Sequence, residues 1–514
     1  MNKLLENQKF IFYLKRTAAT ICFLAVFLYV FTSVTYLFRG SLFNTFNDDR
    51  LNIVGIKEEE QLDMVYIGGS AAYCYWIPMQ AWNDFGFTSY DLGSTSIQSE
   101  NILYLVKHAL KYQKPELFVI GVRSFASYSS EGYEAGLRYT SDSLDLGWDR
   151  LELINTYYKR RRMHENINTV YVDIIKHHIK YDALSSPEAW KLIDNSEEHP
   201  YKGYKLLDTH YYLEEPERFE EGDKSQMHPE AEDTLYELLD FCKEEDLNVL
   251  FVVSPYVMIR EEAEVYRTMD EIITSYGFRF LDLNQCYEEM ELDFSRDFAD
   301  SGHVNVLGAE KYTKFLGSYL VENYGLSDHR AEGDTGWNET CVWFDDMENE
   351  AKASLKDSIA SAKEGDKIAE KLRGIEDLAV WSDLVKDSRF TVLAVGDGTT
   401  LAEIPYIEKK ALEAAGIANI EDENYIRALC DAQILYSNEN DHKTERKINI
   451  GAKENVECVL NNEERALSIM IDGEEYSRKR EDGINVVVYE NDYRYVADSF
   501  TIQRGADGSA ELIR

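Results

Sequence analysis

The sequence is poor in basic residues. Its 514 residues include 54 Lys and Arg against 94 Asp and Glu, which gives a formal net charge of −40. Because neutralising a phosphate backbone needs a basic surface, this balance argues against nucleic acid as a partner. The acidic surplus is spread along the chain and forms no calcium-ligand loop, so we interpret it as a solubilising surface.

Cysteine is also scarce and follows no motif. The seven cysteines contain no Cys-x-x-Cys pair and no metal-like spacing with histidine. A disulfide framework is therefore not expected, although a pairing of Cys430 with Cys458 stays open. We expect neither a metal nor a cofactor. The length of the chain allows two or three domains with proper cores.

One uncharged, largely apolar run lies near the N-terminus, and no second run of that length follows. It extends from Thr17 to Leu37, and its 21 residues span about 31 Å as a helix, enough to cross a membrane. Basic residues in 1–16 predict a cytoplasmic N-terminus and an extracytoplasmic body. No small-x-small cleavage site follows, which favours an uncleaved signal anchor in the cell membrane. Residues 38–59 are expected to form a polar tether.

Short apolar runs alternate with amphipathic stretches over residues 60–325, the first expected domain. Strands separated by helices of this length predict an α/β domain built on a parallel three-layer sheet. Residues 124–228 form a helical insertion, with helices at 151–162 and 167–181, and we expect it to cover the cleft. The expected strands are 64–67, 88–92, 117–122, 249–253 and 278–281. The expected helices are 79–85, 98–112, 229–244, 261–276 and 309–319.

Two short motifs in this domain carry chemistry. In Gly68-Gly69-Ser70, glycines at the end of a predicted strand remove crowding, so the Ser70 hydroxyl faces a crevice. Far downstream, Asp300 and His303 stand three residues apart before a helix. Each has an ordinary explanation alone: a turn serine, a helix-capping aspartate and a structural histidine. Together they predict a triad of Ser70, His303 and Asp300.

Four segments in order resemble the blocks of the SGNH (GDSL-like) hydrolase superfamily. They are Gly68-Gly69-Ser70, Asp91-Leu92-Gly93-Ser94, Pro115 to Gly121, and Asp300-x-x-His303. The closer likeness is to its membrane-anchored cell-envelope members, which include the D-alanine transfer protein of teichoic acids and alginate O-acetylation proteins. The resemblance implies a flavodoxin-like fold and acyl transfer. It makes Ser70 the nucleophile, His303 the general base and Asp300 its orienting partner, with the N–H groups of Ser70 and Gly93 in the oxyanion hole.

Two positions depart from the superfamily pattern. Gly69 replaces the usual acidic residue before the nucleophile. Arg123 stands where the third block has an Asn that donates to the oxyanion. Arg123 or Ser124 are substitute donors, and the alternative role of Arg123 is a structural salt bridge. Losing one oxyanion donor typically costs about 10²- to 10³-fold in rate, so low activity on generic esters is expected.

The resemblance also implies partners. They are a cell-surface polysaccharide or teichoic-acid-like polymer as substrate and an integral-membrane acyltransferase as acyl supplier. The alternative is a catalytically degenerate protein that binds glycan or a partner without turnover. The basic cluster at 159–162 is either a contact for an anionic polymer or lipid headgroup, or a solvated helix face.

The C-terminal third begins with a charged linker and helical region at 326–385, including an exposed helix predicted at 348–371. Residues 386–514 predict a smaller α+β domain with a strand at 390–395, a helix at 404–415 and several later β runs. The segment from Gly483 to Tyr489, with Asp498-Ser499-Phe500, resembles the interleukin-like or GG-type lectin domain. That resemblance implies carbohydrate or protein contact, and a purely structural appendage is the alternative.

Overall fold

The chain divides into two compact units in a computed structural model. The α/β unit comprises Met1–Asp208, Glu215–Asp293 and Asp297–Lys352, and the antiparallel unit comprises Thr209–Glu214, Phe294–Arg296 and Ala353–Arg514. The structure describes residues 2–40, 47–177, 190, 198–213, 215–219, 222–332, 336–386, 389–417, 425–430, 433–437, 445–450, 456–461, 467–471, 474–478, 482–491 and 495–514.

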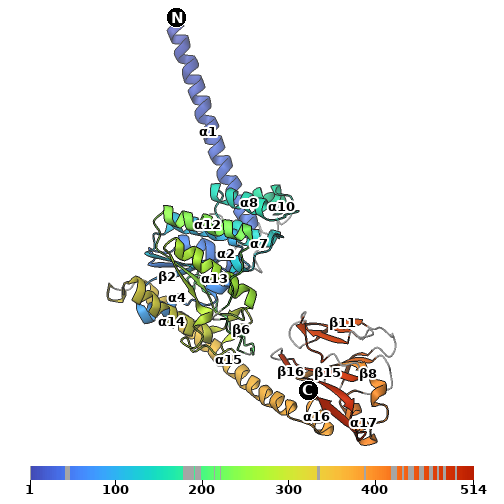
Figure 1. The fold of residues 1–514 in the computed structure, drawn as a ribbon. Helices are drawn as coiled ribbons and strands as arrows, with labels where there is room; N and C mark the ends of the chain where they lie inside the picture. Colours follow the sequence, from blue (N-terminus) through green and yellow to red (C-terminus); the bar gives the residue numbers. More distant parts are fainter. Residues whose placement is uncertain are drawn as a thin grey trace. The chain divides into compact units, whose positions relative to one another are not determined.

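A five-stranded parallel sheet forms the centre of the α/β unit (Figure 1). Its strand order is β2-β1-β3-β4-β5. Every residue of β1, β2 and β4 is buried, as expected for a sheet covered by helices on both faces. The predicted α/β class is thus confirmed. The strands are β1 Met64–Gly68, β2 Ser89–Gly93, β3 Leu117–Gly121, β4 Val249–Val253 and β5 Arg279–Asp282.

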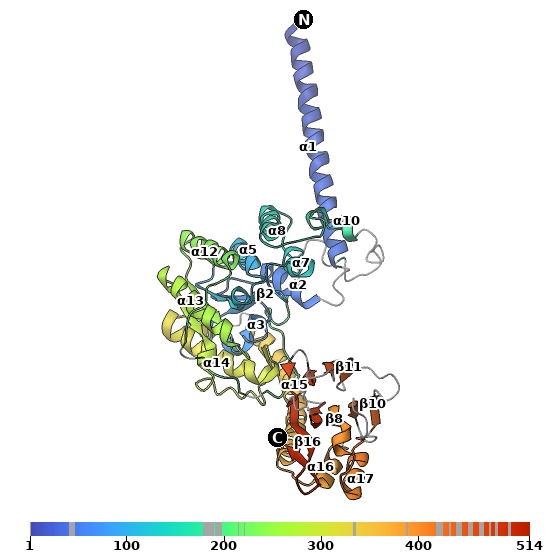
Figure 2. The same cartoon turned by 45° about the vertical axis from the view of Figure 1, so that its right-hand side comes forward.

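Helices pack on the two sides of this sheet. On one side α4 (Pro78–Phe85) contacts α14 (Val306–Tyr324), and on the other α5 (Ser99–Tyr112) contacts α12 (Pro229–Glu244), as Figures 1 and 2 show. Helix α13 (Arg260–Ser275) packs on β5. All these helices lie within a few residues of their predicted ranges, because their apolar residues recur at helical spacing. Shorter elements are α3 Ser70–Tyr73, η3 Leu283–Gln285, η4 Arg330–Glu332 and the hairpin β6 Phe298–Asp300 with β7 His303–Val304.

The helical insertion differs from its prediction in two respects. The helix expected at 167–181 is two short helices, because the Asp173 side chain turns inward and binds Arg150 at 2.8 Å; residues 178–181 lie outside the described part. The basic cluster is only in part a solvated face: Arg160 binds Glu237 at 2.6 Å and Arg161 binds Glu100 at 2.8 Å, whereas Lys159 and Arg162 are exposed. The helices are α6 Arg123–Ala126, α7 Glu134–Ser141, α8 Trp148–Arg160, α9 Asn168–Tyr171 and α10 Ile174–His177.

The N-terminal helix α1 (Asn2–Gly40) contains an apolar stretch, Phe10–Phe38, that is long enough to cross a membrane. The polar tether expected at 38–59 is wrong for its described second half. Helix α2 (Asn47–Val54) and the turn η1 (Gly55–Lys57) pack on the unit and bury Ile53, Val54 and Ile56 completely. Apolar residues spaced among charged ones made this segment look like a linker.

The α/β unit also extends beyond the predicted boundary at residue 325. Helix α15 (Trp337–Arg373) begins with a face that packs on this unit: Trp337 stacks on Trp82 with ring centroids 5.7 Å apart, and Phe344 is buried. Cys341, between them at helical spacing, is buried too. The first turns of α15 are therefore not the linker that the charged composition predicted.

The antiparallel unit contains two sheets and two apolar cores, consistent with a smaller second domain. One core lies between the two sheets, and the other lies between the six-stranded sheet and the helices. Its helices are α16 Leu378–Leu384 and α17 Tyr406–Ala414, with a 3-10 turn η5 Gly398–Leu401. The side chain of Cys458, the proposed partner of Cys430, lies outside the described residues. The six-stranded sheet has the order β10 Gln433–Ser437, β9 Tyr425–Cys430, β8 Phe390–Asp397, β15 Gly483–Glu490, β16 Tyr495–Arg504, β17 Ala510–Ile513. The four-stranded sheet has the order β11 Glu445–Ile450, β12 Val456–Asn461, β13 Ser468–Ile471, β14 Glu474–Glu475.

Candidate active site

Ser70 stands at the carboxyl end of β1, which lies between β2 and β3, and it begins α3. The two preceding glycines are needed because other groups approach them closely. A Cβ on Gly68 would lie 2.8 Å from the Ala72 side chain, and one on Gly69 would lie 2.8 Å from Ile97. The backbone of Gly69 has an ordinary negative φ of −89°, so close approach, and not an unusual conformation, explains this glycine.

Asp300 and His303 face each other across a hairpin of β6 and β7. His303 Nδ1 lies 2.8 and 2.9 Å from the two carboxylate oxygens of Asp300, and the Gly302 N–H donates to Asp300 Oδ1 at 2.7 Å. Burial alone would raise the pKa of Asp300, but the hydrogen bonds from His303 and Gly302 outweigh it and lower that pKa below its usual value. Asp300 is therefore ionised at neutral pH.

His303 joins the carboxylate to the serine. Its Nε2 lies 2.7 Å from Ser70 Oγ. Because Asp300 only accepts hydrogen bonds when ionised, Nδ1 carries the ring proton, and Nε2 is left to accept the Ser70 hydroxyl proton. The structure thus brings together all three predicted residues, over 233 positions of sequence, in the order that nucleophile activation requires.

Arg123 supports the histidine side of this arrangement. It begins α6 after β3, and its Nη1 donates to the Gly302 carbonyl at 2.9 Å. Its guanidinium carbon lies 3.6 Å from the ring centroid of Tyr256, a cation–π contact. Among the described residues it forms no ion pair, so the predicted alternative of a structural salt bridge is wrong. Arg123 holds the turn that carries Asp300 and His303.

Gly93, the second predicted oxyanion donor, ends β2 opposite Gly68. A Cβ there would lie 2.1 Å from the Gly68 carbonyl oxygen, so only glycine fits. It does not line the cavity beside Ser70; Ser96, Ile97 and Gln98 of the following loop do. As the first residue of α3, Ser70 has a backbone N–H without an intrahelical partner, which is available to an oxyanion.

Four residues that were not predicted from the sequence support α3 and the catalytic turn through hydrogen bonds. Ser254 follows β4, and its hydroxyl lies 2.5 Å from the carbonyl of Ala71 and 3.1 Å from Tyr66 Oη. Tyr66 Oη in turn lies 2.7 Å from Tyr312 Oη. On the other side, the Tyr75 hydroxyl lies 2.9 Å from the Gly302 carbonyl oxygen. Ser254 could have been predicted, because it stands at the carboxyl end of a parallel strand, where active-site residues lie. Nothing in the sequence marks the tyrosines as part of the site.

The cavity above Ser70 is small and poor in charge. Its volume is about 260 Å³. Of the described residues that line it, Arg123 and His303 alone are ionisable, and none is a carboxylate; the Ser124 hydroxyl has no hydrogen-bond partner among the described groups. Among its described residues, the insertion contributes Ser124 and Ser127 alone, so α7 to α10 do not cover this cavity as predicted; residues 178–189 and 191–197 lie outside the described part. The other lining residues are Gly69, Ser70, Ala71, Ala72, Ser96, Ile97, Gln98, Gly121, Val252 and Ser254.

Comparisons with known proteins add no relative. No protein-family model matches this chain, and no curated protein does so. The functional argument therefore rests on the four sequence segments and on the geometry around Ser70.

Proposed function

We propose that the protein is a membrane-anchored serine esterase or O-acyltransferase of the SGNH type, with a flavodoxin-like catalytic domain outside the cell membrane. The observation that carries the proposal is the chain of hydrogen bonds from Asp300 through His303 to Ser70, with 2.7 Å between His303 Nε2 and Ser70 Oγ. Hydroxyls are weak nucleophiles, and a positioned base in contact with one is the usual means of activation.

The geometry supports a two-step acyl transfer. His303 Nε2 takes the Ser70 proton while Oγ bonds to the acyl carbon, and the protonated ring then gives that proton to the departing alcohol. In the second step His303 deprotonates water or a sugar hydroxyl, which attacks the Ser70 ester and frees the serine. Asp300 stabilises the charged ring throughout, and Arg123 keeps the turn in place through Gly302.

The cavity favours a short, uncharged acyl group such as acetyl. A volume of about 260 Å³ leaves no room for a long chain beside the ester. An ammonium-bearing group such as D-alanyl would meet the Arg123 cation without a carboxylate to pair with, which disfavours it electrostatically. The acceptor we propose is a cell-envelope polysaccharide or teichoic-acid-like polymer, with an integral-membrane acyltransferase supplying acyl groups.

One observation favours a second candidate, a glycan- or partner-binding protein without turnover. Arg123 replaces the expected Asn and is bonded to Gly302, and Gly93 does not line the cavity. The oxyanion would then depend on the Ser70 N–H and the Ser124 hydroxyl, and a weakened oxyanion hole costs about 10²- to 10³-fold in rate. For the antiparallel unit we propose polymer contact, to be tested by affinity electrophoresis of the full chain and of a chain lacking that unit.

Hydrolysis of two small esters tests the proposal. The full chain in detergent should release nitrophenol from 4-nitrophenyl acetate with an initial burst of one equivalent, and its kcat/KM should exceed that for the alanyl ester at least about tenfold. Ser70→Ala should lose the burst, and Ser127→Ala, at the rim of the same cavity, should keep it. A folded protein with neither burst nor turnover would favour the binding alternative, and a preference for the alanyl ester would overturn the acyl assignment.

A further inference from the structure

The exposed part of α1 is no longer than a bilayer requires. The side chains from Phe10 to Val30, 21 residues, are exposed, whereas Ser33 and residues 35–38 of the same apolar stretch are buried inside the unit. Twenty-one residues rise about 31 Å, against a hydrocarbon core of about 30 Å, and Lys15 and Arg16 within this length extend toward the cytoplasmic headgroups. The exposed length is therefore needed to cross the hydrocarbon core, and the unit begins at the outer leaflet.

The helical insertion surrounds the buried end of α1. The Leu146 N–H donates to the Tyr36 hydroxyl at 3.1 Å, and α10 contacts α1 directly. In both Figure 1 and Figure 2, α8 and α10 lie at the end of the unit from which α1 emerges. This end of the insertion is therefore the part of the unit that meets the bilayer.

Trp148 is the most exposed large apolar side chain of this end. It begins α8 only two residues after Leu146, and it is 86% exposed. It borders a hollow of about 540 Å³ whose wall includes Leu151 and Tyr171. An indole with an apolar body and one polar N–H is poorly accommodated by water and is the typical side chain of a membrane–water interface.

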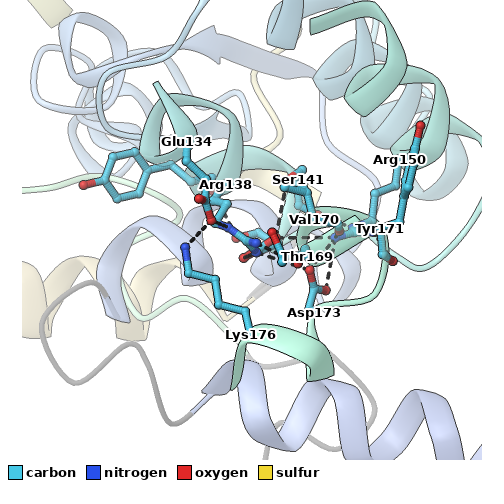
Figure 3. Close-up of polar contacts among 12 residues, drawn as sticks. Glu134, Arg138, Ser141, Arg150, Thr169, Val170, Tyr171, Asp173 and Lys176 are labelled. Atoms are coloured by element: carbon cyan, nitrogen blue, oxygen red, sulfur yellow. Dashed lines mark hydrogen bonds and ion pairs between the residues drawn. The ribbon is translucent and has the colours of Figure 1, made fainter. Parts of the chain in front are cut away.

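A buried ion network fixes α8 to the rest of the insertion (Figure 3). Arg150, in the first turn of α8, donates to the Val170 carbonyl at 2.6 Å and binds Asp173 at 2.8 Å. Arg138 of α7 binds Asp142 at 3.0 Å and Asp173 at 3.3 Å. Lys176 of α10 and Arg138 both pair with Glu134. The charges of the three cations and three carboxylates cancel. The network therefore fixes the helix end that carries Trp148 and adds no net charge beside it.

We propose that this end of the insertion rests on the outer leaflet of the lipid bilayer, with Trp148 as an anchor among the headgroups. The occupant of the surface is the lipid itself, because α1 brings the bilayer to this face and its exposed length leaves no spacer between the bilayer and the unit. The inference requires α1 to span the membrane, but it is independent of the chemistry at Ser70. Its consequence is that the site is held at a fixed height above the membrane and does not swing on a tether.

Fluorescence quenching by lipids tests this surface directly. All seven tryptophans follow residue 75, so α1 contributes no tryptophan emission. The full chain is placed in phosphatidylcholine nanodiscs that contain a headgroup spin-labelled phosphatidylcholine, and each variant is compared with the same discs without label. Wild-type emission should be quenched, and Trp148→Phe should reduce the quenched signal at least about twofold.

The matched control is Trp343→Phe. Trp343 is 54% exposed in the first turns of α15, which pack on α4 through Trp337 and Trp82, and α4 lies away from α1 in Figure 1. Removing Trp343 should leave the quenching unchanged. Thermal unfolding of both variants checks that the fold is kept. Absence of quenching in the wild type, or equal quenching after Trp148→Phe, would overturn the proposal. Loss of quenching in both variants would also overturn it, since it would show that the signal is not specific to the α8 surface.

Discussion

Arg138, Arg150 and Asp173 in the helical insertion are each bonded to several partners inside the protein (Figure 3), whereas Asp300 has one side-chain partner among the described residues, His303. The other ring nitrogen of His303, Nε2, contacts the Ser70 hydroxyl, and Ser70 lines a cavity. Among the described residues of this network, the charged donors and acceptors pair with one another. In the catalytic turn, the chain of hydrogen bonds stops at an atom that a ligand can reach. Paired charges therefore stabilise the fold in one region and prepare a hydroxyl for chemistry in the other.

The largest effect is expected when the general base, His303, is removed. His303→Ala should lower kcat/KM for 4-nitrophenyl acetate by about 10³-fold or more, because members of a triad act as a unit. The matched control is His329→Ala, which removes a second His–Asp pair, His329 Nε2 to Asp63 Oδ1 at 3.1 Å, that does not line the cavity. A loss below tenfold for His303→Ala, or an equal loss in the control, would assign the base elsewhere.

Removing a carboxylate from the insertion should lower stability and leave activity almost unchanged, the opposite of the effect of His303→Ala. Asp173→Ala removes the carboxylate that Arg138 and Arg150 share and leaves them Asp142 as their fully buried carboxylate, so the free energy of unfolding should fall by about 3–5 kcal/mol. Ester hydrolysis by the folded fraction should change little. Glu152→Gln is the control, because its pair with Lys107 is exposed and worth at most about 1 kcal/mol. Denaturant unfolding measures both, and similar losses in the two variants would refute a structural role for the network.

Arg123 lies between these two cases, since it supports the site without belonging to the triad. Arg123→Lys keeps the charge but loses the planar contact with Tyr256 and the directed bond to Gly302. We expect kcat to fall about 10- to 100-fold with little change in KM, because the turn carrying His303 loosens. Arg218→Lys, at an exposed ion pair, is the control. An unchanged kcat would mean that Arg123 does not position the turn.

Two aspartates of the α/β unit should respond oppositely to pH. Burial raises the pKa of Asp91 well above its usual value, and neither of its oxygens has a hydrogen-bond partner among the described residues. Its cost to stability therefore grows as pH rises above its usual pKa of about 3.9. The lowered pKa of Asp300 gives a contribution that is present above about pH 4 and lost as pH falls further, and solvent weakens it because this side chain is 54% exposed.

Asp91→Asn should accordingly raise the unfolding midpoint at pH 7, by about 2–4 °C for each kcal/mol gained. The gain should shrink as the pH is lowered toward 4, where Asp91 of the parent is protonated. Asp300→Asn should give no such gain at pH 7. Thermal melts at several pH values measure these effects, and a destabilised Asp91→Asn protein at pH 7 would show that the carboxylate has a favourable role.

Local pattern was enough to predict the sheet, Ser70 and the Asp300–His303 turn, because each depends on residues a few positions apart. The contacts that hold the site were not predictable in this way. Arg123 and Gly302 are 179 residues apart, and Tyr66 and Tyr312 are 246 apart. Nothing near either residue in the sequence indicates its partner.

Composition gave wrong predictions of linkers where a segment has few apolar residues but these residues lie on one face. The segment 47–57 and the start of α15 are rich in charge, yet each buries a narrow apolar stripe. The break between α9 and α10 depended on the Arg150–Asp173 pair, which forms only when the insertion folds. Whether a stripe of a few apolar residues becomes buried depends on the surface that it packs against, and residues elsewhere in the chain form that surface.

The central claim is that Ser70 is an activated nucleophile, and reaction with a fluorophosphonate tests it without knowledge of the substrate. The full chain should gain one covalent adduct, and peptide mass spectrometry should place it on Ser70. Ser70→Ala should not react, whereas Ser124→Ala, at the wall of the same cavity, should still be labelled on Ser70. Labelling of the Ser70→Ala protein at the parental rate would contradict the account.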